Sequence, residues 1–129
     1  MTDSPVFQLA WIADGFKNWT DSTDAPEDAV DRDAMLTNVT IYWLTNTAGS
    51  SARYYKEGTE TWGEPEAPLS VPTAVAVFPR DINISVRRLA EPNHTIVRWT
   101  EFDRGGHFAS LEEPDLLLGD LRASFRDFR

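Results

Sequence analysis

The feature that most constrains the fold is a nearly uninterrupted apolar run over residues 71–78, Val-Pro-Thr-Ala-Val-Ala-Val-Phe. Strands of parallel sheets are covered on both faces and read as continuous apolar runs, whereas strands with one wet face alternate. Pro72 is compatible with this assignment because proline is tolerated at the first residues of a strand. We therefore predict a strand buried on both faces, which restricts the chain to an α/β architecture.

The residues after this run complete a strand-helix-strand-helix pattern. A short helical pattern covers residues 84–90, a second strand is expected from Thr95 to Phe102, and Pro114 opens a final helix. The apolar positions of that helix are amphipathic in spacing: Leu117, Leu118, Leu121 and Phe125. The two strands should be parallel with a right-handed crossover. Ordinary sheets have about 4–6 strands, so this part predicts the end of a larger α/β fold.

The first half of the chain has helical patterns. We predict a helix from Pro5, capped by Ser4, to about Phe16 or a little beyond, and a polar surface loop over residues 20–33. A second helix should follow, capped by Asp31 or Asp33; its Val-Thr-Ile run at 39–41 also suits a strand, but the apolar spacing favours a helix. We expect a break at 47–51, a helical piece from Ala52, and a linker over 58–70. Residues 1–66 thus form a helical segment and residues 71–129 an α/β part of one incomplete domain.

Composition excludes several classes of function. The net charge of −9 argues against binding to nucleic acid or to an anionic membrane. The absence of cysteine excludes disulfides, thiolate metal sites and a cysteine nucleophile. No apolar run approaches the ~18 residues of a membrane span, and the N-terminus lacks the pattern of a signal peptide. The expectation is a cytoplasmic protein without a membrane segment.

The candidate for acid–base chemistry is His107, which follows the second strand after Gly105 and Gly106. The only other histidine is His94. Asp81 follows the first strand, and parallel strands end on the same side of a sheet, so the carboxylate and imidazole can meet there. Such a pair is the orienting and basic half of a catalytic triad. Two alternatives stay open from spacing alone: a histidine in a structural loop, and an aspartate that caps the following helix.

Several segments together resemble one family. They are residues 3–5 (Asp-Ser-Pro), 36–45 (Leu-Thr-Asn-Val-Thr-Ile-Tyr-Trp-Leu-Thr), 51–57 (Ser-Ala-Arg-Tyr-Tyr-Lys-Glu), 71–79 ending in Phe-Pro, 104–109 (Arg-Gly-Gly-His-Phe-Ala) and 112–114 (Glu-Glu-Pro). In this order they resemble the C-terminal part of microsomal-type epoxide hydrolases. The resemblance implies an α/β-hydrolase fold, in which a helical lid segment precedes the last two parallel strands and their helices.

The resemblance also implies roles for individual residues. His107 matches the family's catalytic histidine and Asp81 its acid. Tyr55 matches one of two lid tyrosines that hydrogen-bond the epoxide oxygen, with its neighbour Tyr54 as the alternative; aromatic packing within a helical lid is the other interpretation of both. Tyr54, Trp43 and Phe108 are the expected substrate-binding residues. The implied substrate is a small-molecule epoxide, and neither a metal nor an organic cofactor is required.

The sequence departs from the family pattern in what it lacks. The nucleophilic aspartate on its Gly-x-x-x-Gly turn, the His-Gly-x-Pro motif and the second lid tyrosine are absent from these 129 residues. We therefore expect the isolated chain to be inactive and to need an N-terminal hydrolase chain or self-association. Two alternatives remain: a non-catalytic binding module, or a related chemistry such as that of haloalkane dehalogenases or esterases.

Overall fold

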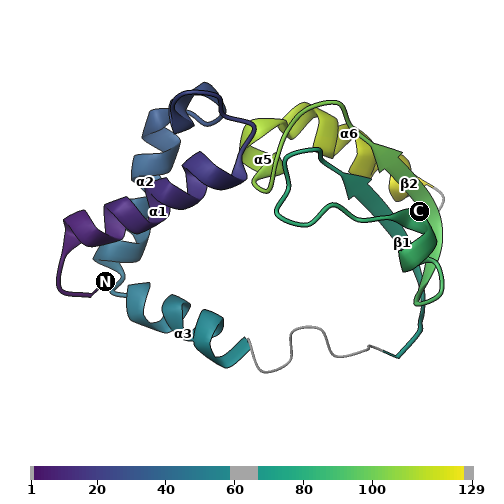
Figure 1. Ribbon diagram of the computed structural model, residues 1–129, viewed down its shortest axis with the longest axis horizontal. Coiled ribbons are helices and arrows are strands. Elements are labelled where there is room, and N and C mark those ends of the chain that lie inside the picture. The colour runs from purple at the N-terminus through teal and green to yellow at the C-terminus, as the bar shows by residue number, and fades with distance from the viewer. Residues whose placement is uncertain (1, 59–66, 127–129) are drawn as a thin grey trace.

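The computed structural model describes residues 2–58 and 67–126. The elements in order are α1 (Pro5–Trp19), the 3-10 helix η1 (Pro26–Asp28), α2 (Arg32–Leu44), α3 (Ala48–Gly58), β1 (Leu69–Val77), α4 (Arg87–Ala90), β2 (His94–Glu101), α5 (Ala109–Glu112) and α6 (Pro114–Ser124). Figure 1 shows α1, α2 and α3 grouped at one end and the strands with α5 and α6 at the other, joined where the end of α1 reaches α5. Most of the predicted linker, residues 59–66, lies outside the described residues.

The first two helices begin where their caps predict. The hydroxyl of Ser4 accepts the Phe7 N–H at 3.2 Å, and the carboxylate of Asp31 accepts the Ala34 N–H at 3.0 Å. The helix α1 ends at Trp19, a little beyond Phe16 as expected, and the helical assignment of residues 39–41 is confirmed. A small core of Phe16, Val30 and Met35 lies between these elements.

Two predictions for the first half are wrong. The break expected at residues 47–51 is confined to 45–47, because Asn46 adopts a left-handed φ of 56° and the next helix already starts at Ala48. The segment 20–33 is not simply a surface loop. Thr20 and Val30 are buried, because the chain folds back beneath the end of α1 and across the start of α2.

The strands β1 and β2 pair in parallel, as predicted, with Val75 opposite Trp99. The expectation that β1 is buried on both faces is wrong for this chain. Phe78 beyond its end is buried, but Val71 is 66% exposed and Leu69 47%. A strand is covered on both faces only when further layers lie over it, and the described residues form a sheet of two strands. The predicted helix over 84–90 is also shorter, covering only α4.

The helix α6 inverts the predicted pattern of burial. Leu118, Leu121 and Phe125 are all more than 40% exposed, whereas Asp120 is buried. The carboxylate of Asp120 accepts hydrogen bonds from Arg98 Nε at 2.7 Å and from Thr100 Oγ1 at 2.6 Å, both on β2. A polar anchor thus holds the helix on the sheet, while Leu117 of the predicted apolar stripe is half-buried and the other three positions are exposed.

Candidate active site

The loops that follow β1 and β2 lie side by side. The Arg80 N–H donates to the Gly105 carbonyl at 3.1 Å, and Arg80 forms a parallel bridge with Gly106. This pairing extends the sheet past the formal ends of both strands. It brings together the two residues that the sequence placed at this edge.

His107 and Asp81 form a hydrogen-bonded pair, with 2.7 Å between His107 Nδ1 and Asp81 Oδ1. The same carboxylate oxygen accepts the Ile82 N–H at 2.7 Å. An ionised carboxylate only accepts hydrogen bonds, so Nδ1 of His107 is the donor in this contact. The alternative that Asp81 caps the next helix is wrong, since the N-cap of α4 is Val86.

Both glycines before the histidine are required by the backbone. Gly105 has a φ of +93°, and a Cβ there would lie 2.8 Å from the buried ring of Phe78. A Cβ on Gly106 would lie 2.7 Å from the Trp19 carbonyl oxygen and 2.9 Å from the Cα of Thr20. The histidine loop therefore passes directly against the backbone at the end of α1.

Several contacts join this loop to the helical segment. The His107 N–H donates to the Trp19 carbonyl at 2.8 Å. The carboxylate of Glu112 accepts the Asp21 N–H at 2.8 Å and the Phe108 N–H at 2.9 Å. The ring of Trp19 meets the imidazole of His107 edge-on, with centroids 5.9 Å apart. The position of the histidine is thus set by α1 as well as by β2.

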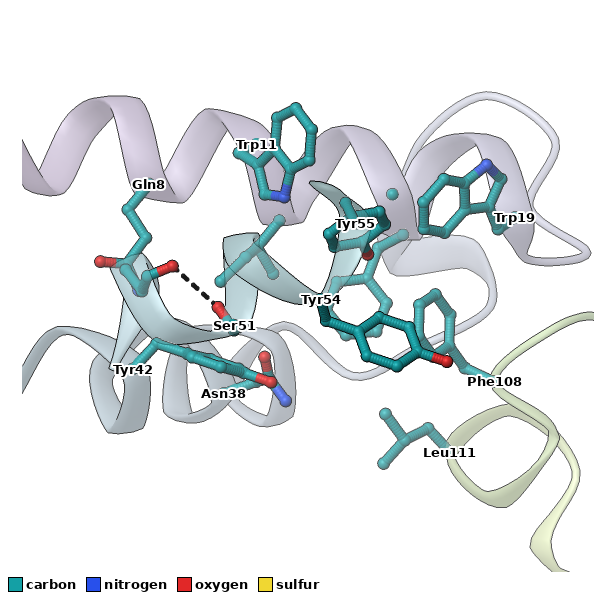
Figure 2. Close-up of a pocket in the computed structure, with 14 residues that line it drawn as sticks. Gln8, Trp11, Trp19, Asn38, Tyr42, Ser51, Tyr54, Tyr55, Phe108 and Leu111 are labelled. Carbon is teal, nitrogen blue, oxygen red and sulfur yellow. Dashed lines mark hydrogen bonds between the residues drawn. The ribbon is translucent and has the colours of Figure 1, made fainter. Parts of the chain in front are cut away.

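A cavity of about 390 Å³ opens beside this junction (Figure 2). Its walls come from α1, α2, α3 and the start of α5, and they are mainly aromatic. The lining residues are Gln8, Trp11, Ile12, Gly15, Phe16, Trp19, Asn38, Tyr42, Ala48, Ser51, Tyr54, Tyr55, Phe108 and Leu111. Such an apolar pocket with a few polar groups is the usual form of a small-molecule site.

Three of the predicted site residues line the cavity. They are Tyr54, Tyr55 and Phe108. Tyr55 is 43% exposed and packs edge-on against Trp11, with centroids 6.0 Å apart, whereas Tyr54 is 71% exposed. The two interpretations of the tyrosines are therefore compatible. Both residues line the cavity, and Tyr55 also packs against another aromatic ring.

The remaining predicted residues lie elsewhere. Trp43 is not among the lining residues; its neighbour Tyr42 takes that place, because α2 turns Asn38 and Tyr42 toward the cavity. His107 and Asp81 are also outside the lining. The imidazole of His107 contacts two lining residues, since its ring centroid is 5.9 Å from that of Trp19 and 5.1 Å from that of Phe108.

The contribution of α1 to the cavity was not predicted from the sequence. Gln8, Trp11, Gly15 and Trp19, spaced three or four residues apart, form one face of the helix and line the cavity. Helical spacing of aromatic residues was the available signal. Because the same spacing is typical of a buried core face, the pattern alone does not separate a pocket wall from a core.

Neither a metal-binding cluster nor a shifted pKa indicates a second functional site in the described residues. Residues 2–58 and 67–126 contain no group of three or more acidic or histidine side chains that could hold a metal ion. The pKa of Asp28 is lowered from 3.8 to about 2, first by the Ala25 N–H, then by the Asp24 N–H and the Thr23 hydroxyl. This carboxylate organises the loop around η1, away from the dyad.

None of the described helices has the length and apolarity that crossing a bilayer demands.

Comparison with known proteins gives a consistent set of relatives. The chain is 45% identical over its whole length to a Stigmatella aurantiaca protein assigned to the epoxide hydrolases, of which it covers 29%. It is 35% identical to epoxide hydrolase 1 of Oryctolagus cuniculus, with 94% of this chain and 29% of the relative covered. The matched region is the C-terminal part of these proteins. No protein-family model matches the chain.

Solved structures agree with these relatives. The epoxide hydrolase of Aspergillus niger matches with a TM-score of 0.81 and 29% identity over 98% of this chain and 31% of that one. Juvenile hormone epoxide hydrolase of the silkworm Bombyx mori matches with a TM-score of 0.83 and 25% identity over 99% of this chain and 35% of that one. The fold is therefore part of an α/β-hydrolase, and the chain spans about a third of these structures.

Proposed function

Since this chain is homologous to the C-terminal part of epoxide hydrolases, we propose that it supplies the water-activating half of an epoxide hydrolase active site. The observation that carries the proposal is the 2.7 Å contact between His107 and Asp81, with the His107 ring next to two residues that line the aromatic cavity, Trp19 and Phe108. The nucleophile comes from an N-terminal hydrolase polypeptide that these 129 residues do not include.

The role of the dyad follows from its hydrogen bonding. Asp81 holds the Nδ1 proton of His107, so Nε2 accepts a proton from water as the water oxygen attacks the carbonyl of an alkyl ester. The carboxylate of Asp81 stabilises the imidazolium that results. The imidazolium proton then goes to the leaving alkoxide, and the second proton of the water goes to the oxygen that ring opening released, so that the carboxylate is regenerated and a diol is released.

Tyr55 has the complementary role in ring opening. The nucleophilic carboxylate attacks one epoxide carbon, the carbon–oxygen bond breaks, and negative charge develops on the oxygen. A phenol donor stabilises that charge. Tyr55 lines the cavity and is held by Trp11, which favours it over the more exposed Tyr54.

The test uses the chain together with an N-terminal hydrolase polypeptide that carries the nucleophile, and an aryl epoxide as substrate. His107→Gln and Asp81→Asn should allow the alkyl ester to form and slow its hydrolysis, so that mass spectrometry detects the trapped ester. Tyr55→Phe should instead slow single-turnover ester formation. His94→Gln is the matched control.

Two outcomes contradict the assignment. One is a His107→Gln protein in which ester formation is lost while ester breakdown is unchanged. The other is styrene oxide hydrolysis by the isolated chain that disappears in His107→Ala, since this would demand direct attack by water without a covalent intermediate.

A second function, as an interaction module, is favoured by one observation. The outward positions of β1 and β2 carry exposed apolar side chains, among them Val71 at 66% and Val97 at 55% exposure. Unpaired apolar strands are templates for association. The partner we propose is the N-terminal polypeptide, and in its absence a second copy of this chain.

A further inference from the structure

Asp21 connects three parts of the molecule that the dyad depends on. It lies just after α1, and its side chain is 35% exposed. One carboxylate oxygen, Oδ2, accepts the Gly105 N–H at 3.1 Å. The other, Oδ1, lies 3.4 Å from Arg80 Nε. The Asp21 N–H in turn donates to Glu112 at 2.8 Å.

These contacts link the two loops that carry the dyad, namely the loop after β1 with Asp81 and the loop after β2 with His107. Arg80 precedes Asp81 in the chain, and Gly105 lies two residues before His107. The backbones of Arg80 and Gly105 are already joined by a hydrogen bond of 3.1 Å. Asp21 accepts the N–H of the same Gly105 residue and approaches the side chain of Arg80. One carboxylate therefore contacts both loops, in addition to the backbone bond that joins them.

The ion pair with Arg80 is of little consequence for stability, because the arginine side chain is 70% exposed. The hydrogen bond to Gly105 is different, since a charged acceptor makes it stronger than a neutral one. Gly105 also adopts a φ of +93°, and the ring of Phe78 occupies the space that a Cβ would need. A shift of this peptide would move the histidine two residues further along.

We infer that Asp21 is a positioning residue for the His107–Asp81 pair, which it couples to the end of the helix α1 that lines the cavity. This inference rests on the proposed function for its catalytic meaning. Its geometric content, that the carboxylate of Asp21 holds the dyad in contact, is independent of any reaction. The segment that the sequence marked only as a polar loop thereby becomes part of the site.

The experiment is NMR spectroscopy of the 129-residue chain, observing the His107 Nδ1–H resonance and hydrogen exchange of the Gly105 amide. His107→Gln assigns the imidazole signal. In Asp21→Ala, the Nδ1–H signal should broaden or vanish as the proton exchanges with water, and Gly105 exchange should rise about tenfold or more. Asp24→Ala is the control, because it removes the same charge from an exposed position in the same loop.

Two milder variants keep the test decisive if Asp21→Ala fails to fold. Asp21→Asn replaces the charged acceptor of the Gly105 N–H with a neutral amide oxygen and should weaken the imidazole signal partially, while Arg80→Gln removes only the exposed ion pair and should leave the signal unchanged. The inference is overturned if folded Asp21→Ala matches Asp24→Ala in both measurements. With no folded Asp21→Ala, an imidazole signal in Asp21→Asn that matches the signal in Arg80→Gln also overturns it. No epoxide enters this experiment, so failure of epoxide turnover leaves its result standing.

Discussion

Replacing Gly106 with alanine should loosen the junction between the helical segment and the sheet. The added Cβ would lie 2.7 Å from the Trp19 carbonyl oxygen, 2.9 Å from the Cα of Thr20 and 3.1 Å from Glu112 Oε2. The first two are backbone atoms and cannot rotate aside. Relief of the overlap requires α1 and the histidine loop to separate.

The size of the effect follows from what this separation breaks. Overpacking a close contact costs about 1–3 kcal/mol. The Trp19 carbonyl also accepts the His107 N–H at 2.8 Å, and loss of that bond adds about 0.5–1.5 kcal/mol. We expect Gly106→Ala to lower the free energy of unfolding by roughly 2–4 kcal/mol.

Gly119 provides a control of opposite sign. It lies inside α6, and a Cβ there would meet nothing within 4 Å. Alanine favours a helix interior over glycine, so Gly119→Ala should raise the free energy of unfolding by ~0.5–1 kcal/mol. Urea unfolding of both variants at one protein concentration measures the difference. Equal stability of the two alanine variants would refute the close approach at Gly106.

Three further predictions test other parts of the structure. Asp120→Ala should lower the free energy of unfolding by about 1.5–3 kcal/mol, because Arg98 and Thr100 lose their shared acceptor; a urea-unfolding change below about 0.5 kcal/mol would contradict this. Asp28 has a lowered pKa in the folded state, so its stabilisation of the loop is complete above pH 3.8 and is lost as the pH falls through about 2; Asp28→Asn should remove this dependence from an acid titration followed by NMR. The isolated chain should self-associate at micromolar concentration, and Val71→Lys should reduce the mass found by light scattering; a compact monomer with one cooperative melt would show that the chain closes its own core.

The sequence alone was sufficient for the order of the elements and for the pair of residues at the edge of the sheet. Local signals decide the helix starts, since Ser4 and Asp31 cap the chain next to them in sequence. Parallel pairing of two apolar segments places Asp81 and His107 at one edge, because strand ends coincide in a parallel sheet. The resemblance to epoxide hydrolases likewise rested on short motifs, and the homologues confirm it.

Only the tertiary structure decided which faces are covered and what holds the dyad. Val71 is exposed although it lies in an apolar run, because the burial of a strand depends on the other layers of the fold, which the sequence of the strand itself does not specify. Asp120 is buried although it is charged, because two donors on β2 happen to lie opposite it. Asp21 looks like any acidic loop residue, and its role arises from contacts with residues about 60 and 84 positions away. Such contacts join segments that are distant in the sequence, so local periodicity and spacing do not predict them.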